Sequence, residues 1–128
     1  MILLLDTSTP MCRLSLVDGE NVHDFEWQAD RTLARNLLAY MRDRLGEFDK
    51  TFEDIDGIGV FRGPGSFTGL RIGLTVCNTM ASSSKIPIVG TLGDNWEEDA
   101  VTRLKAGEND LLVMPEYGAD AHITKPRA

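Results

Sequence analysis

Cysteine is scarce in this sequence, whose 128 residues include only Cys12 and Cys77, with no metal-ligand spacing around either. Two distant thiols are typical of reduced, buried cysteines, which argues against a disulfide-stapled or zinc-binding domain. Histidine is as rare, with only His23 and His122. Because no His-Glu-x-x-His or paired histidine and carboxylate pattern is present, the sequence predicts no metal site.

Long apolar runs and excess positive charge are also lacking. No stretch approaches the roughly 20 apolar residues that a membrane span needs, so we expect no membrane association. The apolar start ends at Asp6 and has no basic segment, which indicates a buried strand rather than a signal peptide. We therefore expect a cytoplasmic protein. The net charge of −7 opposes phosphate backbones, so we expect no tight unaided binding of nucleic acid.

The first third of the chain predicts an antiparallel meander of three strands, at 2–6, 11–17 and 22–27. Turn-forming residues end the first strand, and Asp18-Gly19 between the next two is a hairpin signal. The third strand alternates polar residues with His23, Phe25 and Trp27, which predicts one buried face.

The rest of the chain alternates predicted helices with short apolar strands. An apolar stripe marks the first helix, which Asp30 caps: Leu33, Leu37, Met41, Leu45 and Phe48, with Ala34 and Leu38 beside it. We expect helices over 30–46, 66–83 and 94–106, the last with an Asp94 and Glu97 capping box, and strands over 58–61, 87–89 and 111–114, with an irregular tail from Pro115. This order predicts an α/β fold with a mixed sheet and helices packed on it.

The glycine-rich segment 63–73 is the most informative part of the sequence. Its helix carries small residues every fourth position, which places them on one face: Gly65, Gly69, Gly73, Cys77 and Ala81. Because a glycine inside a helix costs about 1 kcal/mol relative to alanine, we expect close backbone approach at this face. The neighbour could be the chain's own sheet or another protein, and the sequence favours neither.

Two catalytic or ligand-binding alternatives fit this segment poorly. Neither the Walker A spacing nor the dinucleotide G-x-G-x-x-G fingerprint is present, so nucleotide binding by this loop alone is not expected. Ser66 lies outside a G-x-S-x-G elbow and has no marked base, so we interpret it as a helix N-cap rather than a nucleophile.

Two segments, residues 2–9 and Gly63-Pro64-Gly65-Ser66-Phe67-Thr68-Gly69-Leu70-Arg71-Ile72-Gly73, resemble the TsaB (YeaZ) family, and the likeness covers roughly residues 1–92. The resemblance implies an actin-like, ribonuclease-H-like fold of the ASKHA class. The chain differs from the family in having Leu33 and Ala34 where members often carry His-Ser. Members also have a second domain after about residue 100, so we expect 1–92 to form an actin-like domain and 93–128 a reduced segment, a helix, a strand and a tail, packed on it.

The resemblance also implies a function. TsaB members are thought to be inert partners of TsaD, the subunit that transfers a threonylcarbamoyl group to adenosine 37 of tRNAs reading ANN codons, while TsaE and ATP join the assembly. We therefore expect a catalytically inert scaffold with no cofactor of its own, a TsaD-like partner, a TsaE-like ATPase in the complex and indirect contact with tRNA. The alternative is a small ATP-binding or peptidase-like enzyme of the same fold.

The predicted partner interface is the helix pair 30–46 and 66–83, through which TsaB members pair with TsaD. Its expected contact residues are Leu33, Leu37, Met41, Gly65, Gly69, Arg71, Gly73 and Cys77. The same face predicts a homodimer in isolation, because unpartnered apolar helix faces self-associate and two-fold contacts are the commonest. A Gly73→Leu substitution is the disruptor that this hypothesis suggests.

Overall fold

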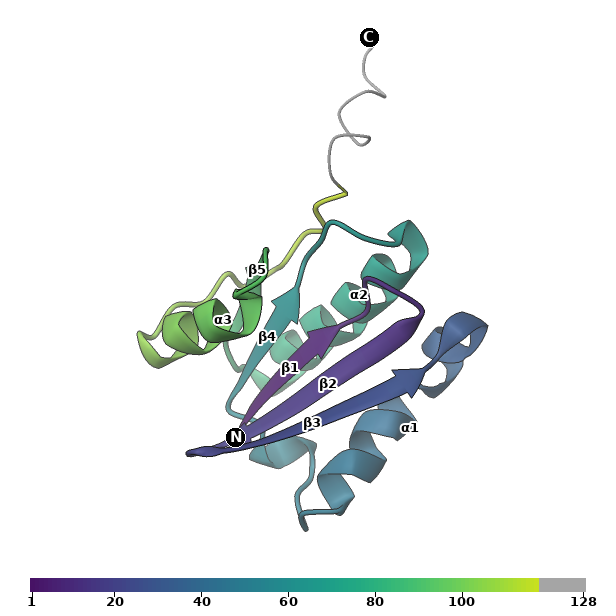
Figure 1. The fold of residues 1–128 in the computed structure, drawn as a ribbon. Helices are drawn as coiled ribbons and strands as arrows, with labels where there is room; N and C mark the ends of the chain where they lie inside the picture. The colour runs from purple at the N-terminus through teal and green to yellow at the C-terminus, as the bar shows by residue number, and fades with distance from the viewer. Residues whose placement is uncertain (118–128) are drawn as a thin grey trace, which may run out of the picture.

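The computed structural model describes residues 1–117, which form one five-stranded mixed sheet with helices on both faces (Figure 1). The strands lie in the order β3-β2-β1-β4-β5. Their bounds are β1 (Ile2–Asp6), β2 (Met11–Asp18), β3 (Asn21–Gln28), β4 (Gly57–Phe61) and β5 (Ile88–Thr91). The helices are α1 (Leu33–Gly46), α2 (Phe67–Ser84) and α3 (Trp96–Lys105), with short 3-10 turns at Asp30–Thr32 and Phe52–Asp54.

The three N-terminal strands form the predicted antiparallel meander. β1 pairs with β2, and β2 pairs with β3 along its whole length, from Met11 opposite Gln28 to Asp18 opposite Asn21. Gly19 in the connecting turn has φ +64, a conformation that glycine adopts without strain, so the Asp18-Gly19 hairpin signal is confirmed. Phe25 and Trp27 pack against the core that α1 covers, Trp27 stacks on Tyr40 of α1, and His23 stacks on Phe48 just after α1.

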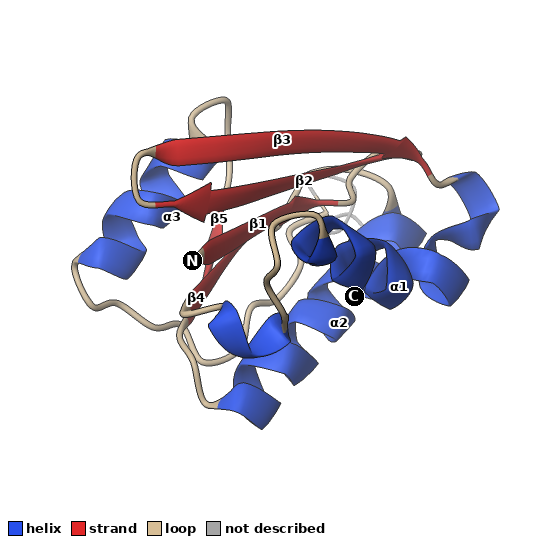
Figure 2. Ribbon diagram, turned by 90° about the horizontal axis from the view of Figure 1, so that it is seen from below, coloured by secondary structure: helices blue, strands red, loops and turns tan. Residues whose placement is uncertain are grey.

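The later strands join the sheet in parallel and bring the helices onto its two faces. β4 pairs with β1 and β5 pairs with β4. α1 and α2 cover one face, and α3 covers the other (Figure 2). Successive residues of β1 serve the two cores, because Leu3 and Leu5 lie under α1 and α2 whereas Leu4 packs against Ala100 of α3. The predicted α/β class and mixed sheet are confirmed.

Two predicted helix caps are wrong. Asp30 lies inside a 3-10 turn at φ +48, and α1 begins three residues later, after Thr32, whose hydroxyl donates to the Ala29 carbonyl. Asp94 and Glu97 do not form a capping box, because the preceding turn is closed by a Trp96 N–H bond to the Gly93 carbonyl and α3 begins only at Trp96. Asp30 and Asp94 both lie within turns that precede the helices, and the helical periodicity does not reveal these turns.

The predicted strand at 111–114 is also wrong. The chain runs beside β5 here, but Leu111 adopts φ +68, which breaks an extended run, and no strand ladder forms in this segment. α3 nevertheless packs on the same sheet as the N-terminal elements, through Ala100 and Leu4. The expected division of the chain at residue 92 stays a prediction, and most of the predicted tail, with His122, lies outside the described residues.

Candidate functional site

The glycine-lined face of α2 lies directly against the turn between β1 and β2. Thr7 donates its hydroxyl proton to the Gly69 carbonyl at 2.7 Å, and the Ser66 N–H donates to the Ser8 carbonyl at 2.8 Å. A Cβ added at Gly65 would lie 2.7 Å from the Ser8 carbonyl oxygen, and one at Gly73 would lie 3.0 Å from Thr7 Cγ2. The small residues therefore allow the chain's own turn to approach the helix closely.

This packing decides between the two explanations that the sequence left open for the glycines. Own-chain contact accounts for Gly65, Gly69 and Gly73, and Cys77 farther along the same face has no exposed surface. A partner is not needed to explain why these side chains are small. Gly73→Leu would break the fold at Thr7, so it cannot serve as a test of an interface.

The apolar contact residues predicted on α1 also face inwards. Leu33 is 5% exposed and Leu37 and Met41 are 0% exposed, because their stripe packs on the sheet. Of the predicted contact residues, Gly65 and Arg71 are exposed and Gly69 is half-buried. The interface on α1 and α2 stays a prediction, and its residues must be sought on the outer side of these helices.

Exposed apolar and cationic side chains do occur on that outer side. Leu38 of α1 is 52% exposed and Phe67 at the start of α2 is 56% exposed. The Arg71 guanidinium lies 5.3 Å from the Phe67 ring centre, and the Tyr117 ring stacks on the Phe67 ring with centres 4.5 Å apart. The periodicity of buried positions does not mark Phe67 or Tyr117 as contact residues, whereas Leu38 stands out as an apolar residue beside the α1 stripe.

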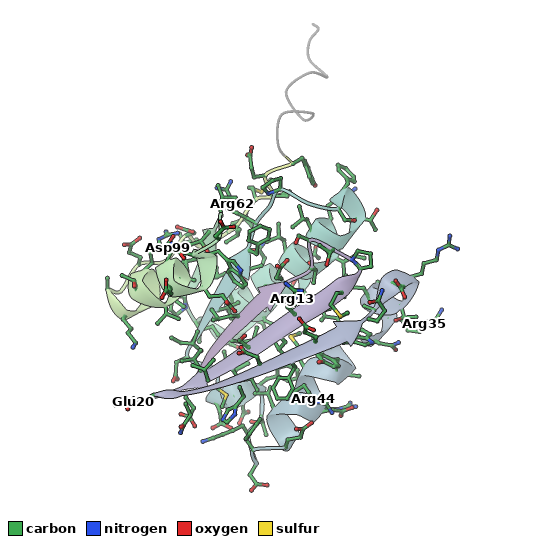
Figure 3. All side chains as sticks on the ribbon, in the orientation of Figure 1. Arg13, Glu20, Arg35, Arg44, Arg62 and Asp99 are labelled. Carbon is green, nitrogen blue, oxygen red and sulfur yellow. The ribbon has the colours of Figure 1, made fainter. Side chains whose placement is uncertain are left out.

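A groove of about 770 Å³ separates the starts of α1 and α2. The β1–β2 turn, the 3-10 turn and the first turn of α2 line it with Thr9, Pro10, Ala29, Asp30, Arg31, Thr32, Leu33, Ser66, Thr68, Gly69 and Ile72. Hydroxyl and apolar groups dominate this lining, with one guanidinium and one carboxylate. On α1 itself, Arg35 extends away from the molecule (Figure 3).

The described residues offer little for covalent or metal catalysis. Ser66 caps α2, since its Oγ accepts the Gly69 N–H at 3.2 Å, which confirms the N-cap interpretation. Burial raises the pKa of Cys77 to about 12, and burial followed by the charge of Asp6 raises that of Cys12 to about 12, so both thiols stay protonated. His23 stacks on Phe48 with ring centres 4.1 Å apart, and residues 1–117 hold no cluster of three acidic, histidine or cysteine side chains that could bind a metal.

Known proteins resemble this chain over the segment that contains both helices. The family model described as TsaD, tRNA N6-adenosine threonylcarbamoyltransferase, matches residues 27–91, about half of the chain. The TsaB protein of Escherichia coli (strain K12) is 30% identical over 111 residues, covering 82% of this chain and 48% of the relative. That of Haemophilus influenzae is 34% identical over 114 residues, covering 88% and 48%. The chain belongs to the TsaB (YeaZ) family.

A solved TsaB-family structure shares the fold. YeaZ from Pseudomonas aeruginosa matches with a TM-score of 0.67 and 33% sequence identity, over 71% of this chain and 43% of the other. The five-stranded sheet is thus the ASKHA-like fold that the resemblance implied. The chain spans about half the length of the curated TsaB relatives it matches. None of the described helices is long and apolar enough to cross a membrane.

Proposed function

We propose that this TsaB-family chain is a catalytically inert, cytoplasmic subunit that pairs with a TsaD-like transferase in threonylcarbamoyladenosine modification of tRNA, together with a TsaE-like ATPase. The observation that carries the proposal is the likeness to the TsaB proteins, which are 30% and 34% identical over 82% and 88% of this chain. The related transferase family model matches residues 27–91, which span α1, β4 and α2. The capping role of Ser66 and the protonated state of both thiols support an inert subunit. Contact with tRNA would be indirect, since the chain carries a net charge of −7.

The proposed contact surface is the outer side of α1 and α2, defined by Leu38, Phe67 and Arg71. Aromatic and arginine side chains dominate binding energy in many interfaces, and Phe67 and Arg71 already form a cation–π pair. Arginines at Arg31 and Arg35 would form the polar rim. A homodimer through the same surface is the competing outcome for the isolated chain.

The test is binding of the full chain to the TsaD-like transferase of the same organism, measured by calorimetry. Leu38→Asp and Arg71→Glu should each weaken binding by about tenfold or more, because each places a wrong charge in the contact. Matched controls are Val22→Asp, at 57% exposure, and Arg13→Glu, both on the opposite face of the sheet. The controls should bind like the parent.

Two results would contradict the proposal. One is a transferase that either binds both helix variants at full affinity or does not bind the parent chain, which would remove the proposed contact. The other is micromolar binding of ATP to the chain alone, which would favour the enzymatic alternative. Sedimentation of the parent chain and Leu38→Asp tells whether the same surface supports self-association.

A further inference from the structure

The outer edge of β5 is hydrogen-bonded throughout, although no described strand pairs with it. The Ile88 N–H donates to Asn109 Oδ1 at 3.1 Å, and the Ile88 carbonyl accepts the Asp110 N–H at 2.8 Å. Two residues along, the Gly90 N–H donates to Asp110 Oδ2 at 2.9 Å, and the Gly90 carbonyl accepts from Arg103 Nη1 at 3.1 Å. Four backbone groups that point away from β4 are therefore all satisfied.

Three of these four partners are side chains, so the contact imitates a strand without being one. Arg103 organises them, because its guanidinium also binds Asp110 Oδ1 and, at 2.7 Å, Glu108 Oε1. Asn109 Oδ1 accepts a second bond, from the Leu111 N–H at 2.9 Å. The carboxamide and carboxylate oxygens thus stand where a neighbouring strand would place its carbonyls.

The backbone of the segment that follows is held by hydrogen bonds to α2 and to the residue after β4. Asn78 of α2 binds both the N–H and the carbonyl of Val113, each at 2.9 Å. Arg62 donates to the Met114 carbonyl at 2.9 Å, and its own carbonyl accepts the Glu116 N–H at 2.7 Å. In Figure 3, Arg62 lies at the end of the sheet where this segment crosses. Val113 is buried, whereas the neighbouring Leu111, Leu112 and Met114 are exposed.

We propose that residues 109–116, here called the edge strap, keep β5 from pairing with the β5 of a second copy of this chain. β5 reads Ile-Val-Gly-Thr and carries no charge that would repel another strand. An uncharged open edge is a template for strand addition. The second copy is the fitting occupant, because a two-fold axis would set the same four groups of Ile88 and Gly90 against each other in an antiparallel pair.

The other edge of the sheet needs no such cover against self-pairing. Asp24 and Glu26 are exposed on β3, so two copies meeting edge to edge there would bring like charges together. The contrast explains why a dedicated segment lies over the short, uncharged strand at the opposite edge.

The test uses the full chain with Asn109→Ala and Asp110→Ala combined, which removes the acceptors for both amides. Hydrogen exchange at Ile88 and Gly90, measured by NMR at low protein concentration, should accelerate roughly tenfold. Sedimentation should show a dimer fraction that rises with protein concentration and exceeds the dimer fraction of the parent chain. Glu108→Ala is the matched control, since it removes one Arg103 ion pair and leaves the four edge bonds in place.

The single variant Asn109→Ala keeps the test decisive if the double variant does not fold. It should accelerate exchange at Ile88 while Gly90 stays protected by Asp110. Unchanged exchange at Ile88 would overturn the proposal. So would a double variant with rapidly exchanging amides whose association matches that of the parent at every concentration.

Discussion

Gly73 shows how one missing side chain positions a turn. It lies on the side of α2 that contacts Thr7, whose hydroxyl donates to the Gly69 carbonyl one helical turn away. A side chain at residue 73 would push Thr7 out of this bond. Because a β-branched residue has few rotamers to escape into, the conflict has to be absorbed by the backbone.

We therefore expect Gly73→Ala to lower the free energy of unfolding by about 1 kcal/mol or more. Overpacking of about 1–3 kcal/mol outweighs the gain of roughly 1 kcal/mol in helix propensity. Denaturant unfolding followed by circular dichroism measures the change. Gly46→Ala is the control, since nothing lies within 4 Å of a Cβ at the exposed end of α1, and it should be neutral or stabilising. A Gly73→Ala protein as stable as the parent would contradict this account of the strip.

Residue patterns predicted which side chains are buried but not what buries them. The four-residue spacing of small side chains located the close-contact face of α2, and the stripe from Leu33 to Met41 located the inner face of α1. The residue pattern left the neighbour of the glycine face open, and the family resemblance included both faces in the expected partner interface. In the structure the chain's own sheet and β1–β2 turn pack against them. A helix buries its apolar stripe equally well against its own sheet, so periodicity alone cannot separate the two cases.

Among the elements, the five strands of the sheet and the middle of each helix were predictable from the sequence, whereas only one of the three expected helix caps was right. Ser66 was identified because it directly precedes the helical pattern and its turn is short. Asp30 and Asp94 resemble caps by residue type, but each helix begins later, after a turn closed by a backbone N–H that donates to the carbonyl of Ala29 or Gly93. Such bonds depend on φ and ψ values that residue types only bias.

The end of α2 contains a strained residue that offers a simple stability test. Lys85 caps the helix at φ +58, where a side chain is unfavourable, and it is exposed. Lys85→Gly should raise the free energy of unfolding by about 0.5–1 kcal/mol, measured by urea denaturation. Gly107 ends α3 at φ +86, so Gly107→Ala should lower stability by about 1 kcal/mol. If both changes shifted the free energy of unfolding in the same direction, this view of the helix ends would be wrong.

The segment after α3 could not be predicted as an element. Its apolar residues at 111–114 are typical of a strand, but the outer edge of β5 is already hydrogen-bonded to Asn109, Asp110 and Arg103. Side chains took the positions that a strand's backbone would occupy. No local pattern signals this outcome, because the partners lie 13 to 21 residues away along the chain.

For the whole molecule, one of the four hydrogen bonds that cover the outer edge of the sheet is accepted by a charged carboxylate, that of Asp110. Burial raises the pKa of Asp110, but hydrogen bonds from Arg103 and the Gly90 N–H, with the Arg103 charge, outweigh it and leave the pKa below its usual 3.8. A lowered pKa in the folded state means that this contribution to stability is present above about pH 3.8. It is lost as the pH falls through the lowered value.

We expect the protection factor of the Gly90 amide to fall in that acidic range, measured by hydrogen exchange. Asp110→Asn keeps an oxygen for the Gly90 N–H but does not titrate, so it should lose this step while retaining the general acid sensitivity of the fold. A Gly90 step that persists in Asp110→Asn would assign the transition to other carboxylates.

The order in which the edge strap and β5 are made has a consequence during translation. Asp110 follows Gly90 by 20 residues, so at roughly 5–20 residues per second the ribosome adds the strap about 1–4 s after the strand. During that interval a nascent chain presents Ile-Val-Gly-Thr uncovered. On a crowded polysome, this uncovered strand can pair with the same strand of a neighbouring nascent chain, and it is a segment that a holdase chaperone can bind.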